Sequence, residues 1–169
     1  MPPRTTYELM AQYNQWMNQK IYAVCVQISD EDRKRDLGAF FKSIHGTLNH
    51  LLYGDKAWME RLAQGTYTPQ TIGASLYDDF TNLQAEREKL DVWILAWAST
   101  LDEAWLQQPF TYTSNVDKKT RTLPTWCLVT HMFNHQIHHR GQVTTLMKQL
   151  GHDPGDTDLP FMPQFGNGV

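Results

Sequence analysis

Apolar side chains recur every three to four residues in four long segments of this chain, which is the period of an α-helix. We place the first helix from a cap at Thr5 or Thr6 to a fading end near residues 29–30, and the second over residues 40–62. The third covers residues 76–97, and the fourth runs from Pro124, in its first turn, to Leu150, with Gly151 just beyond its end. Four amphipathic helices of this length predict an all-α four-helix bundle, and we treat residues 1–169 as a single domain.

Charged and turn-forming residues separate the first three helices. Every residue of the segment 30–36 is charged, so we expect a solvated connection there. Residues 65–75 carry Gly65, Pro69 and Gly73, which predict a loop of moderate length between the second and third helices.

Two shorter features precede the last helix. Ser99 or Thr100 is expected to cap a short extra turn that ends near Trp105. Alternation of side chains over residues 110–122 favours a small hairpin, or merely an extended excursion, before the fourth helix. The proline-containing tail, residues 152–169, is expected to pack along the bundle without regular structure.

Composition narrows the class of protein. The chain has 169 residues, 41% of them hydrophobic, and a formal net charge of −3, which suits a packed core and argues against a nucleic-acid partner. The longest apolar runs are too short to span a membrane, and the N-terminus lacks the apolar core of a signal peptide. Cys25 and Cys127 lie far apart and show no zinc-binding spacing, so we expect free thiols and a cytoplasmic protein.

Histidines interrupt the apolar stripe of the fourth helix. His135 and His139 stand four residues apart, one above the other on the inward face, where two imidazoles can grip one metal ion. A single core histidine that donates to a carbonyl is common, but two on one buried stripe are harder to satisfy in that way. His131 and His138 lie on the flank of the stripe, where they suit supporting or surface roles.

A third metal ligand has to come from another helix. On the second helix, His45 and His50 are both candidates, since both lie off the centre of the apolar stripe and helical geometry does not choose between them. Asp55 is a candidate carboxylate ligand or a group that orients a ligand.

Several catalytic motifs are missing from the sequence. Gln136 stands where a zinc protease of the HExxH type has its glutamate, and the chain has neither Glu-x-x-His pairs for a di-iron site nor a Gly-x-Ser-x-Gly elbow. The remaining interpretation is a mononuclear site with imidazole ligands and an open position for water or substrate.

Four stretches resemble the DinB-like family of four-helix-bundle metalloproteins. Residues 134–142, Asn-His-Gln-Ile-His-His-Arg-Gly-Gln, resemble its NHxxHHRGQ motif, and residues 13–18 resemble the YNxWxN pattern of its first helix. Residues 48–52, with Asp55 and Trp58, are similar to the histidine block of its second helix, and the tail over residues 151–159 also fits. The resemblance covers the chain from end to end, and the HHRGQ block is its most specific part.

This resemblance implies a ligand set and a range of chemistry. Its three metal-binding histidines fall on His50, His135 and His139, with one divalent ion, nickel or zinc first and iron or manganese next. It implies a bundle whose second and third helices are joined by a longer connection, often as a homodimer. Relatives of known activity are transferases or isomerases that use low-molecular-weight thiols such as bacillithiol, mycothiol or glutathione; others are described as metal-dependent hydrolases, and a non-catalytic metal-binding stress-response protein is the remaining alternative.

We therefore hypothesise a metal-dependent enzyme that joins such a thiol to a small electrophile. Neither cysteine lies in a nucleophile pattern, so the thiol would arrive as a cosubstrate. Candidates for catalysis are His131, His138 and Asp55, and candidates for substrate contact are Trp16 and Arg140. Arg140 would either guide an anionic substrate or, as we favour, pair with an acidic residue on another helix.

Aromatic residues on the first and third helices bear on assembly. Tyr22, Trp93 and Trp97 exceed what one inward face per helix needs to bury, which favours a homodimer through helix-on-helix contact. The alternative is ordinary packing of these rings against the hairpin and the tail.

Overall fold

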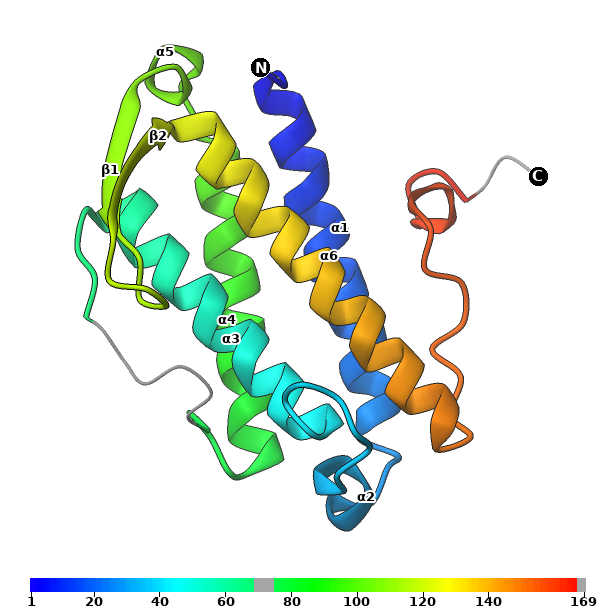
Figure 1. Cartoon of the computed structure of the whole chain (residues 1–169). Coiled ribbons are helices and arrows are strands. Elements are labelled where there is room, and N and C mark those ends of the chain that lie inside the picture. Colours follow the sequence, from blue (N-terminus) through cyan, green and yellow to red (C-terminus); the bar gives the residue numbers. More distant parts are fainter. Residues whose placement is uncertain (69–74, 167–169) are drawn as a thin grey trace.

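Four long helices form the body of the protein in the computed structural model, which describes residues 1–68 and 75–166. They are α1 (Arg4–Cys25), α3 (Ile44–Met59), α4 (Phe80–Ala98) and α6 (Thr125–Gln149). Each of α1 and α3 packs against both α4 and α6, so the four helices surround one core (Figure 1). The predicted all-α four-helix bundle is confirmed.

The direction of the helices explains the long connection. Helices α1 and α6 run one way along the bundle, while α3 and α4 run the other way (Figure 1). Because α3 and α4 are consecutive and parallel, the chain between them has to return along the length of the bundle. The predicted crossover connection between these two helices is therefore confirmed, although Pro69 and Gly73 lie outside the described residues.

The first helix differs from the prediction at both ends. Pro3 is its N-cap residue, so the cap at Thr5 or Thr6 was wrong, and the helix ends at Cys25 rather than near residue 29. The charged segment that follows is not merely a connection, because Asp30–Lys34 forms the short helix α2. Ser29 Oγ accepts a hydrogen bond from Asp32 N (3.0 Å), and the acidic first turn suits the positive end of the helix.

Side-chain caps set the later starts of α3 and α4. Ser43 accepts from the backbone N–H of Gly46 at the start of α3, so that helix begins four residues after the predicted position at 40. Asp79 likewise caps α4, which begins at Phe80 and not at 76. In both places apolar residues continue the helical period on the N-terminal side of the capping residue, where the chain is no longer helical. At its other end α3 continues as a π-helical turn, η1 (Glu60–Gln64), which stops at Gly65 with a φ of +67°.

A two-stranded hairpin lies beside α3, as the first of the two sequence alternatives predicted (Figure 1). Strands β1 (Pro109–Thr113) and β2 (Thr120–Pro124) are antiparallel, with Tyr112 opposite Arg121. Before it, Asp102, rather than Ser99 or Thr100, caps the short helix α5 (Glu103–Leu106). Pro124 is the last residue of β2 and the N-cap residue of α6. It therefore lies just before the helix, which begins at Thr125, and not in the first turn as predicted.

The last helix ends as the sequence indicates. Gly151 has a φ of +81°, and the N–H of His152 donates to Met147 O (2.9 Å), which is the hydrogen bond of a Schellman motif. The tail then runs back along the bundle, where the Tyr13 hydroxyl donates to Thr157 O (2.8 Å). It includes one short 3-10 helix, η2 (Leu159–Phe161), where no regular structure was predicted.

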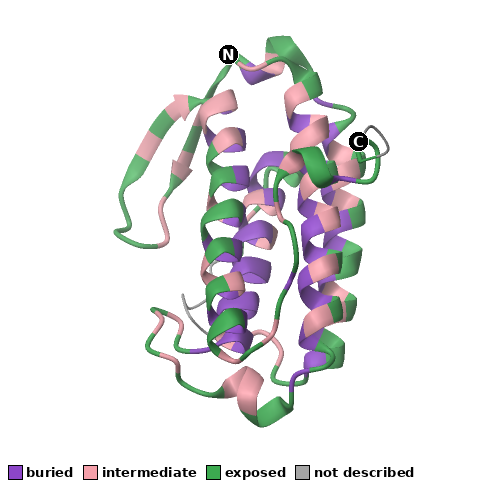
Figure 2. Cartoon of the chain, turned by 90° about the vertical axis from the view of Figure 1, so that its right-hand side faces the viewer, coloured by how far each residue is buried: buried purple, intermediate pink, exposed green. Residues whose placement is uncertain are grey.

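Buried side chains line the inward faces of the long helices (Figure 2). Tyr22 belongs to this core, with 3% of its surface exposed and its ring stacked on that of Phe80, so it is not a surplus surface aromatic. Trp97 is half-buried and packs against Trp105 of α5. Across the described residues, no helix is long and apolar enough to cross a lipid bilayer.

Candidate metal centre

Three histidines from two neighbouring helices meet between α3 and α6. His50 of α3 and His135 and His139 of α6 offer ring nitrogens that all lie within 4.8 Å of one another, and the Nε2 atoms of His50 and His135 are 3.1 Å apart. We call these three residues the histidine triad. His45, the alternative third ligand, turns elsewhere: its Nε2 lies 2.9 Å from Tyr77 O, in the segment before α4.

Each ring of the triad is held by a neighbour. Phe41, in the turn before α3, stacks on His50 with ring centroids 3.8 Å apart. Gly54 leaves the space that the His135 ring occupies, since a Cβ atom on residue 54 would lie 2.8 Å from His135 Cε1. Gln142 Oε1 is 2.8 Å from His139 Nδ1, so that nitrogen donates its proton and Nε2 is left as a lone-pair donor.

The chemistry of the donor set fits a divalent metal ion. Burial, together with the neighbouring rings, lowers the pKa of His135 to about 3 and that of His50 to about 4, and burial also lowers the pKa of His139. At neutral pH all three imidazoles are therefore uncharged, which is the form that binds metal. Nitrogens 3.1 Å apart can both lie at bonding distance, about 2.0–2.1 Å for zinc, from a single ion.

The two flanking histidines of α6 differ in position. His138 is exposed, and its Nε2 lies 3.2 Å from the amide nitrogen of Gln142, the residue whose oxygen orients His139. His131 lies edge-on to Trp58 with ring centroids 5.3 Å apart and faces the same cleft as His135. Of these two catalytic candidates, His131 is the one that lines the cleft beside the triad.

Asp55 points into the protein core. It is 1% exposed, and Oδ2 accepts a hydrogen bond from Arg87 Nη1 of α4 at 2.5 Å. Arg87 also pairs with Asp91 across 2.8 Å, and Asn14 and Asn18 of α1 donate to Asp91. The carboxylate of Asp55 is thus occupied by a buried arginine, which argues against the direct ligand role that the sequence left open.

Arg140 and Trp16, the two candidates for substrate contact, also lie away from the triad's cleft. Arg140 is 3% exposed, donates to Asn14 Oδ1 and lies over the ring of Tyr13. We expected an acidic partner on another helix, but the hydrogen-bond partner of Arg140 is the amide of Asn14. The acidic residues Asp55 and Asp91 act on it from further away. Trp16 packs against Tyr13 and under the ammonium of Lys20.

We call six of these side chains the buried charge cluster. They connect α1, α3, α4 and α6 through opposite charges and amides, deep between the helices. Its members are Asn14, Asn18, Asp55, Arg87, Asp91 and Arg140.

A cleft of about 250 Å³ opens beside the triad, between α3, α6 and the hairpin. His50, His131 and His135 line part of it, and most of the remaining wall is aromatic or aliphatic. The sequence alone does not identify the other residues of this wall as site residues, because the hairpin side chains meet α3 only through the tertiary fold. They are Tyr53, Trp58, Arg61, Tyr112, Asn115 and Val116.

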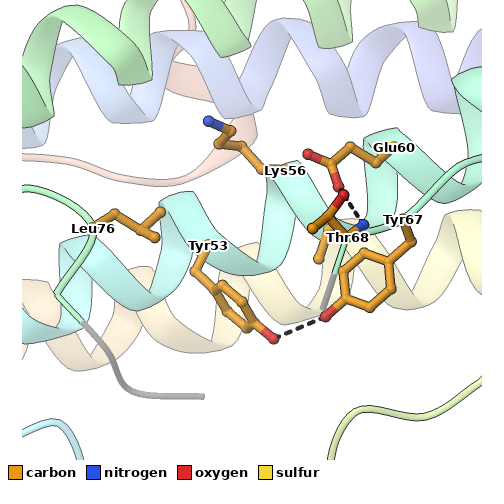
Figure 3. A pocket seen from close by; sticks show the side chains of 7 residues that line it. Tyr53, Lys56, Glu60, Tyr67, Thr68 and Leu76 are labelled. Atoms are coloured by element: carbon orange, nitrogen blue, oxygen red, sulfur yellow. Dashed lines mark hydrogen bonds between the residues drawn. The ribbon is translucent and has the colours of Figure 1, made fainter. Parts of the chain in front are cut away.

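A second hollow lies on another side of α3, bordered by Tyr53, Lys56, Glu60, Tyr67, Thr68 and Leu76 (Figure 3). Its volume is about 10 Å³, which is room for roughly one water molecule. Two hydrogen bonds cross it, between the hydroxyls of Tyr53 and Tyr67 (3.1 Å) and from Thr68 N to Glu60 Oε2 (3.4 Å). This hollow is therefore too small for an organic ligand, whereas the cleft beside the triad has room for one.

Two facing helices that gather three imidazoles at the edge of a cleft define a helical-bundle protein with a candidate mononuclear metal site. Comparison with known proteins gives its family: the sequence model of the DinB family matches residues 1–166, and the chain belongs to that family. Protein DinB of Bacillus subtilis (strain 168) is 25% identical in an alignment of 157 residues that covers 87% of each chain. A DinB-like protein from Bacillus cereus ATCC 10987 has the same fold, with a TM-score of 0.63 and 19% identity over 82% of this chain and 87% of that one.

Proposed function

We propose that the protein binds one divalent metal ion through His50, His135 and His139 and carries out chemistry on a small molecule in the adjoining cleft. The observation that carries this proposal is the convergence of three neutral imidazoles, each supported by a neighbour, beside a largely apolar cleft that His50 and His135 line. Nickel or zinc is the first expectation for the ion and iron or manganese the second, because imidazole suits all of them.

The reaction we favour is transfer of a low-molecular-weight thiol to a small electrophile. A bound divalent ion would lower the pKa of a thiol or a water molecule, making a nucleophile available near neutral pH. The protein's own cysteines are poorly placed, since Cys25 is fully buried and the described walls of the cleft include neither Cys25 nor Cys127. Bacillithiol, mycothiol or glutathione would therefore enter as a cosubstrate.

His131 is the residue we assign to proton transfer. It lines the cleft next to His135, and partial burial lowers its pKa, so its imidazole is neutral at pH 7 and able to accept the proton of an entering thiol. His138 is not among the described residues that line the cleft, and it would act only by orienting His139 through Gln142. The same arrangement also suits hydrolysis, with water in place of the thiol.

Two measurements test this proposal. Elemental analysis of protein purified without chelators should find about one metal ion per chain, and the His135→Ala, His139→Ala double variant should hold none. Metal-loaded protein should then accelerate conjugation of monochlorobimane with at least one of the three thiols, compared with the His50→Ala variant. His152→Ala, which alters a histidine of the tail, is the matched control.

The outcomes separate the alternatives. Absence of metal from the unmodified protein, with no uptake on addition, would refute the metal site. Metal binding without conjugation for any thiol would exclude the transferase and leave the hydrolase or a non-catalytic metal-binding protein. Three protein ligands and an exchangeable water favour catalysis, whereas a fourth protein ligand would favour a structural site.

We also propose that the protein is a cytoplasmic homodimer. Along the outer side of α4, Val92 is 61% exposed, and Trp93 and Trp97 are half-buried, which leaves apolar surface for a second copy to cover. A monomeric mass by light scattering at micromolar concentration would argue against the dimer.

A further inference from the structure

We propose that Arg61 binds the carboxylate of the molecule that enters the triad's cleft, so that the substrate is a small organic acid with an apolar segment between its carboxylate and its reacting atom. The inference rests on the proposed function in taking this cleft as the substrate site. It adds a specificity-determining residue and a chemical class of substrate.

Arg61 belongs to the π-helical turn η1 that continues α3, on the same face that carries His50 in α3. His50, Gly54, Trp58 and Arg61 follow one another at steps of three or four residues, so they share one side of the helix. Their Cα atoms span roughly 16 Å at about 1.5 Å per residue. Because a long helical side chain leans toward the N-terminus, the guanidinium lies back toward the triad, as its hydrogen bond to Ala57 O (3.1 Å) requires.

The guanidinium is buried without an opposite charge. Arg61 is 8% exposed, and the ion pairs between described residues do not include it. The adjacent carboxylate of Glu60 turns to the other side and accepts from Thr68 N (Figure 3). Burying a cation in this way is costly unless an anion completes the site.

The ring of Tyr67 lies 3.4 Å below the guanidinium carbon and that of Trp58 lies 5.3 Å away, so aromatic groups hold the arginine in a fixed plane. Among the described residues, its acceptors are the carbonyl oxygens of Ala57 and Thr113, which leaves donors of its five N–H groups for a ligand. A planar carboxylate matches such a fork, and the wall between Arg61 and the triad suits an apolar body.

Local backbone geometry adds support. The chain leaves α-helical geometry at Glu60, one residue before Arg61, and forms the π-helical turn η1. Such turns are rare and occur frequently at functional sites. The competing interpretation is structural: Arg61 would only join the hairpin to α3 through Thr113 O (3.4 Å).

Calorimetric titration separates the two interpretations. The probes are benzoate, phenylacetate and 3-phenylpropionate, each compared with its neutral amide. Wild-type protein should bind at least one acid more tightly than its amide, and Arg61→Met should weaken that acid about tenfold or more while leaving the amide unchanged. Arg61→Lys should keep part of the preference, and Lys56→Met, which removes a cation of the same helix outside the cleft, should bind like wild type.

The same titration in the His50→Ala variant separates this inference from the metal site. A preference for the acid that persists there and still depends on Arg61 supports the inference whether or not the protein binds metal. Equal binding of acid and amide, no binding of any acid in the series, or an equal loss of both in Arg61→Met would overturn it, even if the triad holds metal and conjugates thiols.

Discussion

The histidine triad and the buried charge cluster are two polar sites in one helical bundle, and they are built on opposite rules. In the charge cluster, Arg87 lies between Asp55 and Asp91 at 2.5 and 2.8 Å, and every member is almost fully buried. In the triad the three rings are neutral and crowd together without a compensating charge, next to an open cleft. Opposite charges that pair with one another hold the helices together, whereas lone pairs that converge from three neutral rings are suited to bind a ligand.

The largest effect is expected from breaking the charge cluster. Arg87→Met would leave Asp55 and Asp91 buried without their cation and should lower the free energy of unfolding by about 3–5 kcal/mol. Urea denaturation measures this change. Arg121→Met, which breaks the exposed pair with Asp117, is the matched control and should change the free energy of unfolding far less.

Metal content of the Arg87→Met protein sharpens the comparison. If the two sites are separate, the fraction that remains folded should still hold about one metal ion per chain. A folded protein that has lost its metal would instead show that the charge cluster also positions the triad.

A smaller effect, confined to the triad, is expected from Gly54→Ala. The new Cβ would lie 2.8 Å from His135 Cε1, so the ring has to move and metal affinity should fall by about 100-fold, the upper end for changes outside the ligands themselves. Competition with a chromogenic chelator measures the affinity. Stability of the metal-free protein should change by less than about 1 kcal/mol, because alanine also favours the helix; unchanged metal affinity would contradict the assigned role of Gly54.

The smallest effect is a difference in pH dependence between the two sites in metal-free protein. The folded-state pKa values of His135 and His50, about 3 and 4, lie below the ordinary 6.5, so protons bind the unfolded chain first and stability falls as pH drops from 6.5 toward 4. Burial raises the pKa of Asp91 from 3.8 to about 6, so this carboxylate acts in the opposite direction and adds stability as pH drops from 6 to 4.

Urea denaturation across this pH range tests the opposition. A His50→Gln, His135→Gln variant should lose less stability on acidification than wild type, and Asp91→Asn should lose more. Parallel pH profiles for the three proteins would refute the assignment of either site.

Helix ends show where sequence patterns stop being sufficient. Phe41 and Leu76 continue the apolar pattern of α3 and α4, yet both lie outside the helices because Ser43 and Asp79 cap them. These caps are standard signals and could have been identified from the sequence. The burial of Arg140 and Asp55 could not, because a helical pattern gives the side of a helix that a residue occupies but not which helix that side meets.

The sequence by itself determined the four helices, the Schellman end of α6 and the pair His135–His139, because these depend on spacing along one helix. The crossover connection between the second and third helices came from the resemblance to the DinB-like family. Spacing left His45 and His50 open as the third ligand, and only the resemblance to the DinB-like family selected His50. The tertiary structure decided that His50 faces α6, that Arg140 joins the core and that the hairpin walls the cleft in front of Arg61. The physical reason is that contacts between elements depend on how each helix is rotated and packed, and packing is settled by the whole core at once.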